Sequence, residues 1–317
     1  MKIGTDLGKA KALLEEGKLV AIPTETVYGL AANALNEDAV LRIFKAKNRP
    51  TFDPLIIHAA SLEQVRPLLR DVPSLAERLF NHFAPGPLTI LLPRTHQIPD
   101  LVTAGLGTVA LRIPRHPLTL ELLKTLDFPL AAPSANPFGY VSPTRPDHVA
   151  AQLEEQVSYI LDGGPAEVGL ESTIVQITSE DKMHVLRKGG LPIENLEALG
   201  PVKVFQHSTS NPRAPGMLKS HYAPRKPLKL GYLDELLAGH PNQRVGVLAF
   251  KRTIPEIPAA QQRILSPEGD LAEAARNLFA AIRSLDTLDI DLILAEWVPE
   301  KGLGRAINDR LRRASAE

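Results

Sequence analysis

Short apolar runs alternate with amphipathic segments along most of the chain, which is typical of an α/β protein. Pro, Gly or polar residues bound the apolar runs, as expected of strands buried in a sheet. We predict strands at residues 19–22, 55–57, 88–92, 109–113, 130–132, 159–161, 172–177, 184–187, 228–230, 245–249 and 292–295.

The amphipathic segments between these runs predict helices. Residues 39–46 have apolar positions at helical spacing, with Asn36 placed to cap the first turn and Pro50 just past the last one. Further helices are expected at 9–16, 62–69, 74–83, 117–126, 146–153, 193–199, 270–285 and 305–313.

This periodicity is lost between residues 205 and 227, a stretch rich in Pro, Ser, His and Lys. So long a stretch without periodicity inside a compact protein is usually a linker or a functional lid. Strands and helices alternate again from residue 228, which predicts a small domain with a parallel sheet. A chain of 317 residues is also long for one domain, so we expect two.

Composition and charge narrow the class of protein. The chain has no cysteine, which excludes disulfides, Cys-ligated metals and thiol nucleophiles. Its 36 Lys and Arg balance 36 Asp and Glu, so no net charge draws it to nucleic acid or to an anionic membrane. The first residues lack the apolar run of a signal peptide, and no apolar stretch is long enough to span a bilayer. We therefore expect a cytoplasmic protein with no membrane contact.

Polar residues at the ends of two apolar strands predict a ligand site. Thr26 lies in a polar turn after the strand at 19–22, and His58 ends the next strand. Lys47 and Arg49 lie between them, and on an extended chain both cations would point to one face, which suits a polyphosphate. A capped turn, a structural histidine and a solvated helix end are the alternative interpretation.

Two further features could bind an anion. Arg112 interrupts an apolar strand, where a charge is costly unless a ligand carboxylate, a phosphate or an internal Asp or Glu pairs with it. Ser134 and Asn136 follow a buried strand, where they could donate to phosphate or simply form a turn beside Pro133 and Pro137. The Gly-rich phosphate loops of common nucleotide-binding folds are absent, so any nucleotide would bind to scattered side chains.

Eight motifs follow one another along the chain: Ile22-Pro-Thr-Glu-Thr-Val-Tyr-Gly-Leu30, Lys47-Asn-Arg-Pro50, Pro54-Leu-Ile-Ile-His58, Pro85-Gly-Pro-Leu-Thr89, Val109-Ala-Leu-Arg-Ile-Pro114, Ala132-Pro-Ser-Ala-Asn136, Glu171-Ser-Thr-Ile174 and Arg187-Lys-Gly189. In this order they resemble the motifs of the YrdC/Sua5 family of threonylcarbamoyl-AMP synthases. Two more motifs resemble the long Sua5 form: Pro215-Gly-Met-Leu-Lys-Ser-His-Tyr-Ala-Pro224 and Gly302-Leu-Gly-Arg-Ala-Ile-Asn-Asp-Arg-Leu311. The resemblance implies a YrdC-like catalytic domain with a twisted mixed sheet at 1–204, a linker and active-site lid at 205–227, and a small Rossmann-like parallel α/β domain at 228–317.

The resemblance also implies an activity. Family members condense L-threonine, bicarbonate or CO2 and ATP into threonylcarbamoyl-AMP and pyrophosphate. The product supplies N6-threonylcarbamoyladenosine at position 37 of tRNA through a downstream tRNA threonylcarbamoyl-transferase complex. Mg2+ is implied with ATP, held mostly by phosphate oxygens and water, so no metal-ligand motif is expected.

Residue roles follow from the same resemblance. The set implied around the phosphates is Lys47, Arg49, Ser134 and Asn136. The residues implied to bind L-threonine are Thr26, His58, Arg112, Ala132 and Ser172, with Arg112 on the carboxylate. The further ATP contacts implied are Asp53, Thr108, Ser142, Arg187 and Tyr222. Asp53 departs from the Asn that family members often carry, so it would face the phosphates as a carboxylate or act through Mg2+.

Two rival functions stay open at this point. One is a non-catalytic module for tRNA or double-stranded RNA, with a basic patch formed by Lys45, Lys47, Arg49, Arg305, Arg310, Arg312 and Arg313. Balanced charge and few aromatic residues count against it, although a weak tRNA contact is compatible with synthase activity. The other is a hydrogenase-maturation carbamoyltransferase, but those proteins carry Cys-rich zinc elements and this chain has no cysteine.

Overall fold

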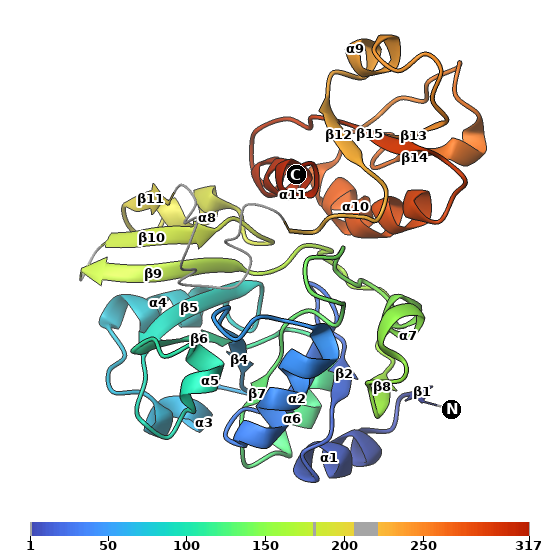
Figure 1. Cartoon of the computed structure of the whole chain (residues 1–317). Coiled ribbons are helices and arrows are strands. Elements are labelled where there is room, and N and C mark those ends of the chain that lie inside the picture. Colours follow the sequence, from blue (N-terminus) through green and yellow to red (C-terminus); the bar gives the residue numbers. More distant parts are fainter. Residues whose placement is uncertain (1, 180–181, 206–220, 317) are drawn as a thin grey trace.

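A mixed sheet of eleven strands and a separate parallel sheet of four strands organise the described part of the chain (Figure 1). The computed structural model describes residues 2–179, 182–205 and 221–316. The strands of the large sheet, in spatial order, are β1 (Ile3–Gly4), β8 (Tyr159–Leu161), β2 (Val20–Ile22), β3 (Gly29–Asn33), β7 (Leu130–Ala131), β4 (Ile56–His58), β6 (Thr108–Arg112), β5 (Leu88–Pro93), β9 (Thr173–Ser179), β10 (Lys182–Arg187) and β11 (Val202–Val204). The predicted α/β class is confirmed, with a mixed sheet in the larger domain and a parallel sheet in the smaller one.

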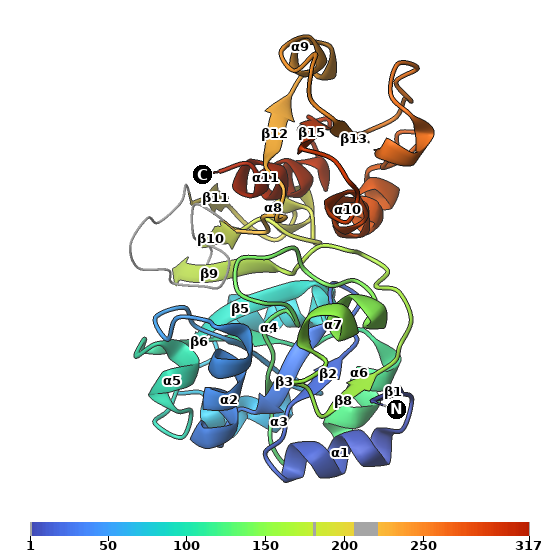
Figure 2. The same ribbon diagram turned by 45° about the vertical axis from the view of Figure 1, so that its right-hand side comes forward.

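The two faces of the large sheet bury alternate residues of each strand. Leu19 and Ala21 belong to one core cluster, whereas Val20 and Ile22 belong to another on the opposite face. Helices α2 (Glu37–Lys47), α3 (Leu62–Val65), α4 (Ser74–Phe83), α7 (Pro146–Leu153) and α8 (Ile193–Glu197) contribute to the first cluster. Helices α1 (Leu7–Glu15) and α6 (Pro117–Lys124) contribute to the second. Figure 2 shows β2 and β3 between α2 and α6.

Several elements differ from the prediction. The strand β3 was not predicted, nor were β1, β11, β14 (Gln262–Ile264), α5 (Asp100–Thr103) and α9 (Leu233–Ala238). The helix expected at 62–69 is divided, because α3 passes at Arg66 into a 3-10 turn that contains Pro67, a residue without an N–H to donate. Asn36 caps α2 as predicted, since its side chain accepts from the backbone N–H of Ala39.

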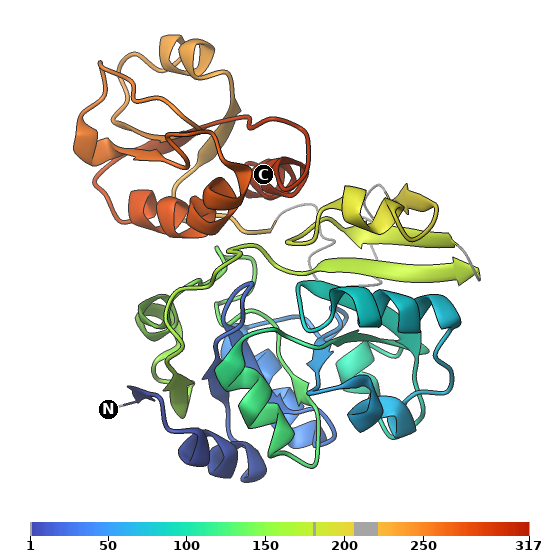
Figure 3. The same ribbon diagram turned by 180° about the vertical axis from the view of Figure 1, so that it is seen from behind.

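The smaller sheet has the order β12 (Leu228–Gly231), β15 (Leu292–Glu296), β13 (Val245–Ala249) and β14, with all pairs parallel. Helices α10 (Leu271–Asp286) and α11 (Gly304–Ala314) cover the face toward the larger domain, and α9 lies on the other side (Figure 3). None of the helices in the described ranges is long and apolar enough to cross a membrane.

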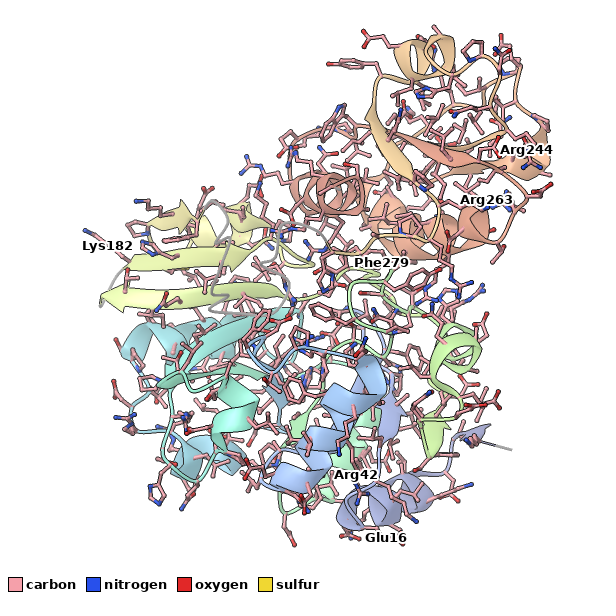
Figure 4. The ribbon with its side chains drawn as sticks, in the orientation of Figure 1. Glu16, Arg42, Lys182, Arg244, Arg263 and Phe279 are labelled. Atoms are coloured by element: carbon pink, nitrogen blue, oxygen red, sulfur yellow. The ribbon has the colours of Figure 1, made fainter. Side chains whose placement is uncertain are left out.

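The two domains share one apolar cluster. It joins Val27 and Val141 of the larger domain, Tyr222 after the large sheet, and residues of α10 and α11. Figure 4 places Phe279 of α10 on the side of that helix that faces the larger domain, where its ring stacks on Tyr222 with centroids 5.7 Å apart. Arg283 of α10 donates to the backbone carbonyl groups of Val141 and Ser142. The domain contact is therefore both apolar and hydrogen-bonded.

Candidate active site

A pocket of about 550 Å³, counting its open mouth, lies beside the ends of the central strands of the large sheet. Its walls come from the turn after β2, from β4 and β6, from the loop after β7, from the entry to β9, from the end of β10, and from two residues before β12. The lining residues are Thr24, Thr26, Val27, Gly29, Arg49, Ile56, His58, Arg112, Ala132, Pro133, Ser134, Glu171, Ser172, Arg187, His221 and Tyr222.

Strand register places three polar side chains in a row across the sheet. His58 on β4 pairs with Arg112 on β6, and Arg112 pairs with Thr89 on β5. Because neighbouring strands lie about 4.8 Å apart and paired residues point to the same face, the imidazole, the guanidinium and the hydroxyl line up side by side. The Thr89 hydroxyl lies 2.7 Å from that of Ser172, so the row ends at a second lining residue.

Arg112 is paired by an internal acid. Its Nη2 lies 2.8 Å from Oε1 of Glu25, and both side chains are buried. Nη1 donates to Oγ1 of Thr26 at 2.7 Å, and Nε donates to the carbonyl of Gly86 at 3.3 Å. Burial raises the pKa of Glu25, but the charge and hydrogen bonds of Arg112 outweigh this effect and lower the pKa overall. The pair therefore fixes Arg112 at the pocket wall.

Arg49 is held in a similar way by Asp53. Its Nη2 lies 2.9 Å from Oδ2 of Asp53 and 2.9 Å from the carbonyl oxygen of Pro54, and its Nε donates to the carbonyl of Asp53. This leaves Nη1 of Arg49 without a hydrogen-bond partner among the described residues. Asp53 itself is fully buried and does not line the pocket. Its carboxylate faces Arg49 rather than the cavity.

Lys47 lies behind the Ser134 loop. Its ammonium donates to the carbonyl of Ser134 at 2.6 Å and also to the carbonyl of Asn136. The chain is not extended here, as a common face for Lys47 and Arg49 would require, because Lys47 ends α2 and Asn48 turns the chain with a left-handed φ of 51°. Burial and the nearby charge of Arg49 lower the pKa of Lys47. Lys47 thus fixes the loop that presents Ser134.

Glu171 supplies a carboxylate that was not predicted as a site residue. It lines the pocket, accepts a hydrogen bond from Ser142, and lies 2.8 Å from Nε of Arg310 on α11. Arg310 is fully buried and lies over the ring of Tyr222, 4.8 Å from its centroid. Burial raises the pKa of Glu171, but Arg310 and Arg187 lower it overall. The C-terminal domain therefore supports two lining residues from behind, although none of its own described residues lines the pocket.

The structure brings most of the predicted residues together. The lining includes Thr26, Arg49, His58, Arg112, Ala132, Ser134, Ser172, Arg187 and Tyr222. Lys47, Asn136 and Ser142 lie directly behind lining residues, while Thr108 begins β6 at the end opposite Arg112. The predicted lid residues Met217, Leu218 and Lys219 lie outside the described residues. Glu171 was missed although its motif was noted, and His221 was noted only as part of the linker.

Most members of the basic patch suggested for RNA binding are buried or paired with acids, whereas Lys45 is exposed. Four of its members, Lys47, Arg49, Arg310 and Arg313, are buried. The remaining two arginines are paired with acids, since Arg305 lies 3.5 Å from Glu194 and Arg312 lies 3.4 Å from Glu300. The sequence shows where the cations lie along the chain, but it does not show which of them become buried when the chain folds.

A strand-end pocket whose arginines are held by buried acids, with an arginine of the second domain behind one wall, defines an α/β protein with a site suited to anionic ligands. Comparisons identify the family. A family model described as "Telomere recombination" (Sua5_yciO_yrdC) matches residues 12–189, and one described as "Threonylcarbamoyl-AMP synthase, C-terminal domain" matches residues 191–316. The chain belongs to the Sua5/YrdC family of threonylcarbamoyl-AMP synthases, as its motifs predicted.

Individual relatives cover nearly the whole chain. A threonylcarbamoyl-AMP synthase of Pyrococcus abyssi is 42% identical over 96% of this chain and 93% of its own length. The Bacillus subtilis enzyme of the same name is 41% identical over 98% of this chain and 92% of its own. The crystal structure of P. abyssi Sua5 complexed with L-threonine has a TM-score of 0.91, with 42% identity, and covers 98% of this chain and 94% of that one. Escherichia coli YciO, at 22% identity and a TM-score of 0.52, shares the fold of the larger domain.

Proposed function

We propose that this chain condenses L-threonine, bicarbonate or CO2 and ATP into threonylcarbamoyl-AMP and pyrophosphate. The observation that carries the proposal is one pocket with two separately held arginines, Arg112 on one wall and Arg49 on another. One cation suits an amino-acid carboxylate and the other suits a polyphosphate. The L-threonine complex of the P. abyssi relative supports the choice of amino acid.

In this proposal, the row of polar side chains across the sheet forms the part of the pocket that binds L-threonine. Arg112 binds the substrate carboxylate with the N–H groups that Glu25 and Thr26 leave unused. Thr26, His58 and Ser172 surround the amino and hydroxyl groups, and Ala132 leaves room for the methyl group. Burial lowers the pKa of His58 to about 3, and the charge of Arg112 acts in the same direction, so its imidazole is neutral near pH 7.

The nucleotide side is built on Arg49, Arg187, Ser134 and Tyr222. Lys47 and Asn136 fix the Ser134 loop, while Ser142 acts through Glu171; Thr108 stays a predicted contact of the nucleotide. The threonine amine adds to CO2 and loses a proton, which gives a carbamate. A carbamate oxygen then attacks the α-phosphorus and pyrophosphate leaves. The chain contributes position, charge and exclusion of water, with no covalent intermediate.

Mg2+ is proposed to arrive with ATP. Among the described residues there is no group of three or more His, Cys, Asp or Glu side chains that could hold a metal ion. The carboxylate nearest the Arg49 side, Asp53, is engaged by that arginine. The donor set therefore suits an ion held by phosphate oxygens and water, which would screen the charge of the triphosphate.

The domain roles are proposed along the same lines. Residues 1–204 form the catalytic domain, 205–227 the linker and lid, and 228–317 a domain that supports the pocket through Arg310. The described part of the linker supports the lid, because His221 and Tyr222 line the pocket. The product would pass to a tRNA threonylcarbamoyl-transferase complex for the modification of adenosine 37. A weak tRNA contact remains a prediction.

The test incubates the folded protein with MgATP, bicarbonate and L-threonine. Threonine-dependent pyrophosphate release is measured, and the mixed anhydride is detected by mass spectrometry, with each substrate omitted in turn. We expect product only when all three are present. A folded protein that forms no product under these conditions would overturn the proposal.

A further inference from the structure

The hydroxyl of Thr24 lies directly behind that of Thr26. Oγ1 of Thr24 is 2.7 Å from the carbonyl oxygen of Val27 and 2.7 Å from Oγ1 of Thr26. A carbonyl oxygen can only accept, so the one proton of the Thr24 hydroxyl points to Val27. In the contact between the two hydroxyls, Thr26 must therefore donate and Thr24 must accept. Oγ1 of Thr24 also accepts longer hydrogen bonds, 3.2 Å each, from the backbone N–H groups of Thr26 and Val27, so Thr24 holds the backbone of the turn as well as the Thr26 hydroxyl.

The Thr26 hydroxyl takes part in a second hydrogen bond, which it accepts from Arg112. Its Nη1 donates to Oγ1 of Thr26 at 2.7 Å. The Thr26 hydroxyl thus gives its only proton to Thr24, accepts one hydrogen bond from Arg112, and keeps one lone pair. Because Thr26 is fully buried and lines the pocket, that lone pair is available only to a bound molecule.

A second pair of hydroxyls, which includes the lining residue Ser172, has no such fixed polarity. The hydroxyls of Ser172 and Thr89 lie 2.7 Å apart, and either of them can be the donor. Ser172 also accepts from Nη2 of Arg187 at 3.1 Å. Its proton can turn toward Thr89 or toward a ligand, whereas the proton of Thr26 cannot. The relay, which is the chain of hydrogen bonds from Arg112 through Thr26 and Thr24 to Val27, therefore has a fixed direction that the Ser172–Thr89 pair lacks.

We propose that Thr24 is a positioning residue that fixes Thr26 as a hydrogen-bond acceptor for the amino-acid substrate. Thr24 acts through Thr26, and the substrate group that Thr26 receives is a donor, either the amino N–H or the side-chain hydroxyl. A site whose buried acceptor is left unpaired by a wrong ligand discriminates strongly against that ligand. This inference rests on the proposed function, since it takes L-threonine as the ligand.

The test measures dissociation constants of L-threonine and L-2-aminobutyrate, which lacks the hydroxyl, by calorimetry. T24V replaces the hydroxyl with a methyl group of similar size, and T24S restores it. T119V is the matched control, because Thr119 is another buried threonine whose hydroxyl donates to the same turn, at the carbonyl of Pro23, but takes no part in the relay. We expect T24V to weaken L-threonine about tenfold, and T24S and T119V to stay within about twofold of wild type.

The second ligand identifies the substrate group. If Thr26 receives the hydroxyl, T24V weakens L-threonine but not L-2-aminobutyrate; if it receives the amino group, T24V weakens both alike. Equal losses in T24V and T119V, or a T24S variant as weak as T24V, would overturn the proposal. If T24V does not fold, T24A removes the same hydroxyl without an added methyl group. A wild-type protein that binds no L-threonine would instead count against the proposed function itself.

Discussion

Arg310 and Glu171 form an ion pair across the domain contact, with Nε 2.8 Å from Oε2, although 139 positions separate them in the sequence. Arg310 is fully buried and also covers the ring of Tyr222. Because Glu171 and Tyr222 both line the pocket, one arginine of the C-terminal helix α11 supports two of its walls. The second domain is thus part of the site's construction.

We expect R310M to destabilise the protein by roughly 3–5 kcal/mol, because it leaves the buried Glu171 carboxylate without Arg310 and leaves Asp309 paired with Arg313 but not with Arg310. Urea unfolding near pH 7 measures the loss. R310K, which keeps the charge but not the planar fork, should lose less. The double variant E171Q/R310M should recover part of the loss, since it no longer buries a lone charge. Equal stability of R310M and wild type would mean that the pair contributes little to the domain contact.

We expect R112M to abolish detectable synthesis and to weaken L-threonine binding roughly 10- to 100-fold, because Arg112 is the cation assigned to the substrate carboxylate. Calorimetry with L-threonine measures the effect. The variant also strands Glu25, so E25Q/R112M is the control: it should fold better than R112M while binding L-threonine no better. Normal synthesis by a folded R112M variant would refute the role given to Arg112.

Sequence periodicity predicts the elements that depend on local pattern. The bounds predicted for α7 and β8 are those observed, because apolar spacing and a nearby Pro or polar residue define both. The strand β3 escaped prediction because two of its five residues are alanines, which favour no strand on their own. Its strand conformation comes from pairing with β2, where Leu30 lies opposite Ala21.

The residues of the candidate site also fall into two groups, those that a local sequence pattern indicates and those that only tertiary packing brings into place. Cations and hydroxyls at strand ends could be found from the sequence because they interrupt apolar runs, as Arg112 does. The acids that pair with these cations could not be found from the sequence, because pairing depends on strand register and domain packing. Glu25 meets Arg112 only when the β2 turn folds against β6, and Asp53 meets Arg49 only after Asn48 turns the chain. The sequence therefore predicts the ligand-facing residues better than the acids that hold them.

We expect the free energy of unfolding to decrease as the pH falls from 7 to 5, because His58 is buried in its neutral form. Burial lowers its pKa to about 3 in the folded protein, whereas an unfolded histidine titrates near 6.5. Its contribution to stability is therefore complete above pH about 6.5 and is lost as the pH falls toward 3, since only the unfolded chain takes up the proton. Between pH 7 and pH 5 this amounts to about 2 kcal/mol of unfolding free energy.

Urea unfolding of wild type and H58Q at several pH values measures this contribution. The difference in unfolding free energy between the two proteins should shrink by about 2 kcal/mol from pH 7 to pH 5. The same substitution at the exposed His96 controls for the removal of an imidazole. A difference that stays constant with pH would show that His58 does not stay neutral in the folded protein.

We expect D53N to tighten pyrophosphate binding about tenfold, because it removes a buried negative charge 2.9 Å from Arg49 and close to Lys47. Asparagine keeps the size of the side chain, and Arg49 still donates to the backbone carbonyl groups of residues 53 and 54, so the Arg49 loop should be retained. D38N is the matched control, since Asp38 is an exposed acid at the opposite end of α2.

Calorimetry with pyrophosphate and with MgATP separates two roles for Asp53. If Asp53 only holds Arg49, D53N tightens both ligands; if it serves the ion that accompanies ATP, D53N tightens pyrophosphate and weakens MgATP. Unchanged affinity for pyrophosphate would mean that the Asp53 charge does not reach the nucleotide side of the pocket.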